Sequence, residues 1–156
     1  MRFIIAFVLI AAFISGCDTR RVFEDNKDFN KRAWTLSDTV AFEFSIPEPT
    51  ANYNLLCNIR NSLDYPYSRI FVNYTLEDST HRVLVTKLVS DYLFDVKTGE
   101  PKGNSGIGDI DDHRFSLESR KLSAGKYFVK LQQYMRTDTL HGVLAAGVRV
   151  EKIALD

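Results

Sequence analysis

Strict alternation of apolar and polar side chains is the feature that most limits what this chain of 156 residues can fold into. In residues 40–46 the apolar members of the alternation are Val40, Phe42, Phe44 and Ile46, and a proline follows directly. Because a β-strand points successive side chains to opposite faces, this pattern predicts a strand with one buried face. Further apolar-rich runs, separated by turn-forming residues, lie at 53–60, 70–76, 82–94, 127–135 and 143–153.

The number and spacing of these runs predict the fold class. No segment after residue 33 carries a long three-to-four-residue apolar repeat with helix caps, so we reject a helical domain. We expect residues 34–156 to form an all-β domain, an antiparallel β-sandwich of the Greek-key or jelly-roll kind. The 20 basic and 20 acidic residues give a formal net charge of +0, which argues against a nucleic-acid partner.

The first 16 residues differ from the rest of the chain. One charge, Arg2, precedes an unbroken apolar run over residues 3–14. As a helix this run spans about 18 Å, which is short of the roughly 30 Å of a bilayer's hydrocarbon layer. Residues 1–16 are therefore interpreted as a cleaved signal peptide rather than a membrane span.

The residues at the end of this run resemble the lipobox that lipoprotein signal peptidase recognises. Ile14 is followed by two small residues and then by Cys17. We expect Cys17 to carry an S-diacylglycerol and an N-acyl chain, which together bind a membrane strongly. Residues 17–33 are interpreted as this lipidated N-terminus and a charged tether. With Cys17 acylated, Cys57 has no disulfide partner, and its place in an alternating run predicts a buried, unreactive thiol.

The glycine-rich segment 97–113 holds four of the eight glycines and is too long for a hairpin turn. Within it, Asp109, Asp111 and Asp112 are weak candidates for calcium ligands, because carboxylates on a loop can converge on one cation. Their spacing does not fit an EF-hand, so a solvated acidic loop is the favoured interpretation and no metal is predicted. The stretch 103–107 lacks the last glycine of a nucleophile elbow. We identify no catalytic residue and no cofactor site, and predict that the protein is not an enzyme.

Two tyrosines flank a proline between the second and third apolar runs. Because proline fixes its own backbone angle, Tyr65 or Tyr67 can be held outward as a contact for a partner. The alternative is a tyrosine that closes a corner of the sandwich by hydrogen-bonding the backbone. Short Asp-Ser/Thr strings that resemble acceptor sites for O-glycans begin at residues 38, 78 and 138, where turns or strand ends are the simpler interpretation.

Several long strings extend a resemblance over nearly the whole chain beyond the signal peptide. They include R-N-S-L-D-Y-P-Y-S-R at 60–69, M-R-T-D-T-L at 135–140, and shorter strings at 21–24, 76–80, 92–101 and 106–110. These strings resemble the gliding-motility lipoprotein GldH family of Bacteroidetes-type bacteria. The resemblance implies an envelope lipoprotein linked with the machinery that moves or secretes adhesins. It implies no enzymatic mechanism and assigns a role to Cys17 alone.

These observations lead to one expected function and one alternative. We expect a lipid-anchored, non-enzymatic accessory component of gliding motility and its associated secretion machinery, with protein partners in that apparatus. No strongly acidic string follows Cys17. We therefore expect the protein at the outer membrane, facing the periplasm. The alternative is an envelope glycan-binding β-sandwich that uses Tyr65 and Tyr67.

Overall fold

The computed structural model describes residues 18–47 and 51–153, so the predicted signal peptide 1–16 and Cys17 lie outside the described residues. Most of the described chain lies in β-strands. Its elements are β1 (Arg21–Asp28), η1 (Asn30–Arg32), β2 (Ala33–Thr35), β3 (Val40–Ile46), β4 (Ala51–Ser62), β5 (Arg69–Asp78), β6 (Val83–Tyr92), β7 (Asn104–Ser105), β8 (Ile110–Leu122), β9 (Gly125–Gln133), β10 (Thr139–His141) and β11 (Val143–Lys152).

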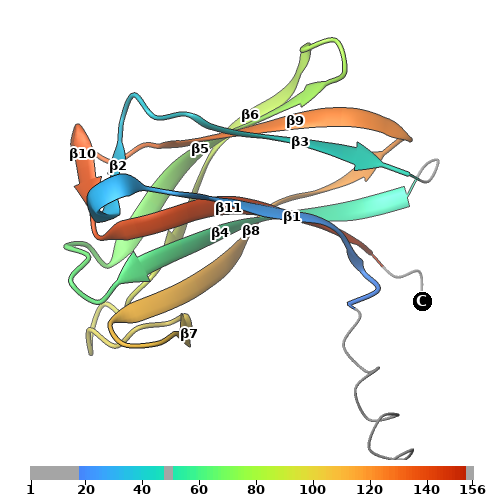
Figure 1. Ribbon diagram of the computed structural model, residues 1–156. Helices are drawn as coiled ribbons and strands as arrows, with labels where there is room; N and C mark the ends of the chain where they lie inside the picture. The colour runs from blue at the N-terminus through green and yellow to red at the C-terminus, as the bar shows by residue number, and fades with distance from the viewer. Residues whose placement is uncertain (1–17, 48–50, 154–156) are drawn as a thin grey trace, which may run out of the picture.

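The strands form two antiparallel sheets that pack face to face (Figure 1). The first sheet has the order β1-β11-β4-β8-β7, and the second has the order β3-β9-β5-β6. The short strands β10 and β2 pair separately. The predicted antiparallel β-sandwich is therefore confirmed. Within the described residues, no helix has the length and apolar character needed to cross a membrane.

The core lies between the two sheets, where the alternating side chains meet. The predicted alternation in β3 is observed, because Val40, Phe42, Phe44 and Ile46 are buried and the residues between them are exposed. Cys57 on β4 is fully buried, as expected, and burial raises the pKa of its thiol. A buried thiol with a raised pKa is poorly reactive.

Residues 21–28 do not form the tether expected from their charge. They are β1, an edge strand of the first sheet that pairs with β11 from Phe23↔Val150 to Asp28↔Ala145. Phe23 faces the second sheet, and its ring centroid lies 6.5 Å from that of Phe42. The high charge of this segment is misleading because only two of its side chains, Val22 and Phe23, pack against the core, and the others of this edge strand are polar.

The glycine-rich segment 97–113 is also more ordered than a free loop. Asn104 of β7 pairs with Asp112, and Phe94 forms an isolated bridge with Pro101. Its last residues, 110–113, already belong to β8.

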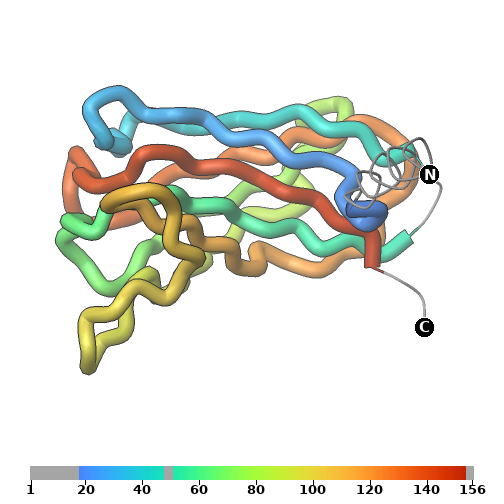
Figure 2. The backbone as a smooth tube through the Cα atoms, turned by 60° about the horizontal axis from the view of Figure 1, so that its bottom comes forward, coloured from blue at the N-terminus to red at the C-terminus, as the bar shows by residue number. Residues whose placement is uncertain are grey.

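The two ends of the sandwich differ in what they carry. The chain enters β1 at the end where β11 finishes, and the segment between β6 and β8 projects at the opposite end (Figure 2). Strand β8 has 13 residues and connects these ends. At about 3.3 Å per residue, the ends lie roughly 40 Å apart.

Candidate functional site

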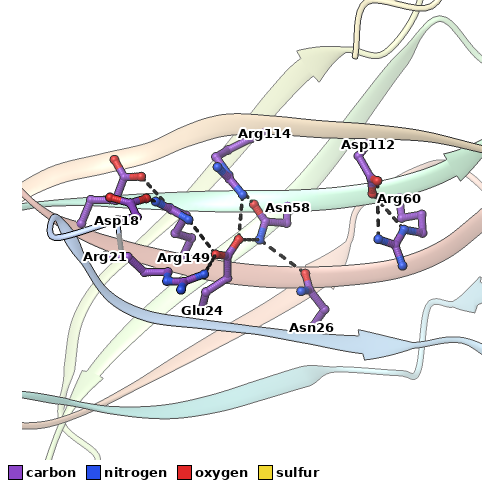
Figure 3. Close-up of polar contacts among 10 residues, drawn as sticks. Asp18, Arg21, Glu24, Asn26, Asn58, Arg60, Asp112, Arg114 and Arg149 are labelled. Carbon is purple, nitrogen blue, oxygen red and sulfur yellow. Dashed lines mark hydrogen bonds and ion pairs between the residues drawn. The ribbon is translucent and has the colours of Figure 1, made fainter. Parts of the chain in front are cut away.

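A network of charged and amide side chains covers part of the outer face of the first sheet (Figure 3). It joins β1, β4, β8 and β11, whose alternate residues point away from the core. We call it the outer network, and its members are Asp18, Arg21, Glu24, Asn58, Arg114, Arg149 and Glu151.

Arg149 of β11 is the centre of the outer network. Its side chain is only 7% exposed and contacts three carboxylates. Nη1 donates to Glu24 at 2.7 Å, Nε donates to Glu151 at 2.5 Å, and Nη2 donates to Asp18. Burial alone would lower the pKa of Arg149, but the three carboxylates outweigh it and raise this pKa. Arg149 therefore stays charged and holds the start of the described chain against the sheet.

Glu24 of β1 links Arg149 to the neighbouring strands. Its Oε1 accepts hydrogen bonds from Arg114 at 2.7 Å and from Asn58 at 3.0 Å, and Arg21 lies 3.2 Å from Oε2. Burial raises the pKa of Glu24, but the hydrogen bonds from its partners exceed that effect, so the net shift is downward. This carboxylate stays ionised and is not a candidate proton donor.

Gly147 of β11 has no side chain, which lets β1 approach β11 closely. A Cβ atom at Gly147 would collide with the Asn26 side chain and the Asp25 carbonyl. Beside this contact is a hollow of about 240 Å³, which is lined in part by Asn26 and Ala145. Arg60 and Asp112 also line it and form an ion pair at 2.9 Å. The hollow is polar, and its charged groups already have partners.

The three candidate calcium ligands do not converge. Asp109 pairs with Arg32 at 2.5 Å, whereas Asp112 points to the outer face. Asp111 directly precedes Asp112 in β8. Because successive side chains of a strand point to opposite faces, Asp111 points into the sandwich, where it is fully buried. Across residues 18–47 and 51–153, no group of three or more His, Cys, Asp or Glu side chains is arranged to hold a metal ion.

Asp111 and His113 of β8 form a buried polar pair that was not predicted from the sequence. His113 Nε2 lies 2.8 Å from the Asp111 carboxylate, and both side chains are almost fully buried. Burial lowers the pKa of His113, and the attraction of Asp111 opposes this shift only in part. A Cβ atom at Gly103 would lie 2.8 Å from both side chains, so glycine is needed to cover the pair. The sequence signal that could have revealed this pair is that His113 occupies an apolar position in the alternating pattern of β8.

The two candidate contact tyrosines have different environments. Tyr65 is buried, its hydroxyl donates to the Arg69 carbonyl at 3.1 Å, and its ring is stacked with Phe94. Tyr65 therefore closes a corner of the fold, as the alternative interpretation predicts, and does not present its ring to a partner. Tyr67 is 43% exposed and packs edge-on against Tyr65. The glycan-binding alternative therefore keeps only one of its two rings.

An open groove of about 730 Å³ lies between the edge strands β1 and β3. Phe42 lies on one side, and Asp25 and Lys27 line the other. The pairing of β1 with β11 shows that both charged residues share the inward side with Phe23. Inward charges on an edge strand discourage pairing with another chain.

The fold and the outer network define an antiparallel β-sandwich whose N-terminal strand is fixed by ion pairs immediately after residue 17. Residues 21–150 match the GldH lipoprotein family, and the chain belongs to this family. It is 28% identical over 152 residues to the gliding motility lipoprotein GldH of Flavobacterium johnsoniae, with 93% of each chain covered.

A second relative and one solved structure complete the comparison. The GldH homolog of Christiangramia forsetii is 31% identical over 155 residues, which cover 94% of this chain and 93% of the relative. The pre-peptidase C-terminal domain of a Bacillus anthracis collagenase aligns with 82% of this chain and 87% of its own, at 12% identity and a TM-score of 0.38. Similarity at that level carries no functional argument.

Proposed function

We propose that this chain is a lipid-anchored protein of the cell envelope that works as a non-enzymatic accessory component of gliding motility and its associated secretion machinery. Family membership supports this proposal, since both relatives are named for gliding motility. The lipobox residues that end at Cys17 supply the anchor. We further propose that the protein lies at the outer membrane and faces the periplasm.

Family membership is the observation that carries the proposed role, and the contact between Asp18 and Arg149 supports the way in which the domain is held at the membrane. Only Asp18, Thr19 and Arg20 separate Cys17 from β1. Because Asp18 is already bound to β11, a lipid on Cys17 holds one end of the sandwich at the membrane surface. The loops at the other end then stand roughly 40 Å farther along the sandwich axis. This orientation suits a component that presents one surface to a neighbouring protein complex.

Replacement of Cys17 by serine tests the anchor. We expect Cys17→Ser to give an unprocessed protein that takes up no labelled fatty acid and supports no gliding. Cys57→Ala is the matched control, because it removes the other thiol and leaves the lipobox intact. A soluble Cys17→Ser protein with full activity in cells would contradict the proposal. Membrane fractionation and external protease treatment of intact cells test the membrane and the face.

A further inference from the structure

We propose that the outer face of the second sheet is a docking surface for a protein partner that presents carboxylates beside apolar side chains. This inference rests on the proposed function, because it assigns the face through which the anchored component meets its machinery. We call the surface the aromatic patch and define it by Arg69, Phe71, Leu88, Tyr92 and Tyr134.

Strand register brings the patch together. Ile70 and Val72 of β5 are fully buried, so Arg69 and Phe71 point outward. On β6, Tyr92 lies opposite Arg69.

Leu88 and Tyr134, the remaining members of the patch, lie on either side of β5. Leu88 lies opposite Asn73, the next outward residue of β5 after Phe71. On the other side of β5, the Tyr134 amide donates to the Phe71 carbonyl at 2.8 Å. Three adjacent chain segments therefore supply one continuous surface.

Three side chains of the patch are well exposed. Tyr134 is 58% exposed, Leu88 is 52% exposed and Tyr92 is 38% exposed. Clustered exposed apolar residues mark interaction sites more often than scattered ones do. Tyrosine and arginine are also the residue types that contribute most to protein interfaces. The opposite outer face of the sandwich carries the outer network, which is charged and internally paired.

The patch also carries positive charge that the protein does not neutralise. The Arg69 guanidinium carbon lies 4.8 Å from the Phe71 ring centroid and 4.9 Å from that of Tyr92. The Lys102 amine lies 5.8 Å from the Tyr92 ring centroid. Among the described residues, Arg69 forms no ion pair with a carboxylate, in contrast to Arg149, whereas the charge of Lys102 helps to lower the pKa of Asp95. An acidic partner therefore gains charge complementarity here.

These contacts favour a protein partner over a glycan. Sugar rings stack on the open faces of aromatic side chains, but Arg69 and Lys102 already lie over Tyr92. The hollow of about 270 Å³ that Tyr92 and Lys102 share with Asp91 and Asp112 is lined mainly by charged and polar groups. In addition, β6 is the terminal strand of its sheet, so a large partner can approach the patch from the side as well as from the front.

Site-specific photo-crosslinking in living cells tests the docking surface. A photoreactive amino acid replaces Tyr134 in the full chain, and another chain carries it at Ser116, an exposed control position on the outer face of the first sheet. We expect one discrete adduct from position 134 and none from position 116. In the first chain, Arg69→Glu or Tyr92→Ala reduces the adduct about tenfold, whereas Arg69→Lys preserves most of it. The crosslinked partner peptide contains Asp or Glu.

Several results would overturn the docking surface: no adduct at position 134, equal adducts at both positions, or an adduct insensitive to Arg69→Glu. A sugar in place of a peptide in the adduct would do the same. Melting temperatures close to that of the unsubstituted protein show that the variants fold. Fatty-acid labelling of each variant separates the two proposals. An anchored variant with an unchanged adduct contradicts only the docking surface, whereas an active Cys17→Ser protein contradicts the proposed function.

Discussion

Arg149 of β11 binds Asp18, so the residue next to the predicted lipid anchor is fixed to the body of the sandwich. The two residues are 131 positions apart in the sequence. Their contact closes the first sheet around the point where the chain enters it, because the same guanidinium also holds Glu24 of β1. Only residues 18–20 therefore separate the proposed anchor at Cys17 from β1.

Replacement of the central arginine should weaken the whole fold. Arg149→Met removes the cation from partly buried Glu151 and leaves Glu24 with Arg114 and Arg21 only, and we expect the free energy of unfolding to fall by about 2 kcal/mol. Arg60→Met is the matched control, because the Arg60–Asp112 pair is about half exposed on both sides and should contribute less than about 1 kcal/mol. Urea unfolding of the detergent-solubilised protein measures both. Equal losses would show that Arg149 has no special role.

A side chain at Gly147 should displace β1. Gly147→Val places atoms where the Asn26 side chain and the Asp25 carbonyl now lie, so β1 must move away from β11. We expect faster hydrogen exchange at the amides of residues 21–28, while β5 in the other sheet keeps its protection. Ser116→Val adds a similar side chain at an exposed position of the same sheet and serves as the control. Unchanged exchange in β1 would refute the close approach.

Acid should destabilise the protein in two stages. The pKa of buried His113 lies below its ordinary value of 6.5, so the unfolded chain takes up a proton first as the pH falls below about 6.5, and stability decreases. Asp111, Asp91 and Asp112 also act on this histidine, and their charges reduce the shift.

The second stage comes from carboxylates. The pKa values of Glu24 and Asp78 are lowered, that of Asp78 to about 2, so their protonation removes further stability below about pH 4.5. Urea midpoints from pH 8 to pH 3 measure both stages. His113→Gln should make the urea midpoint nearly independent of pH between pH 7 and pH 5, and should leave the fall below about pH 4.5 unchanged. If the urea midpoint of His113→Gln still fell between pH 7 and pH 5, another titrating group would be responsible for that loss of stability.

The two tyrosines beside Pro66 should respond differently to truncation. Tyr65→Ala empties a buried site and should cost about 3 kcal/mol of stability. Tyr65→Phe loses only the hydrogen bond to the Arg69 carbonyl and should cost about 1 kcal/mol. Tyr67→Ala at the exposed position should cost less than about 1 kcal/mol. Thermal and urea unfolding compare the three variants, and a larger loss for Tyr67→Ala would reverse the structural assignment.

The strand pattern of the second sheet was predictable because local geometry determines it. The alternation around Phe42 and Phe44 follows from the two-residue repeat of an extended chain with one face in the core. The same reasoning correctly placed Cys57 in the interior. It failed for residues 21–28, because most side chains of an edge strand are solvated and its sequence resembles a linker. It also left open which of Tyr65 and Tyr67 is held outward, because proline fixes a backbone angle without deciding which side of the loop is covered.

The sequence by itself determined the β-sandwich class, the buried thiol and the resemblance to one lipoprotein family, since each depends on side chains that are near one another along the chain. Only the tertiary structure decided that Asp18 meets Arg149, that Asp111 and Asp112 point in opposite directions with different partners, and that Arg69 lies between Phe71 and Tyr92. Those relationships depend on which strands become neighbours and in what register. Strand order is set by the packing of the whole core, and no short stretch of sequence contains it.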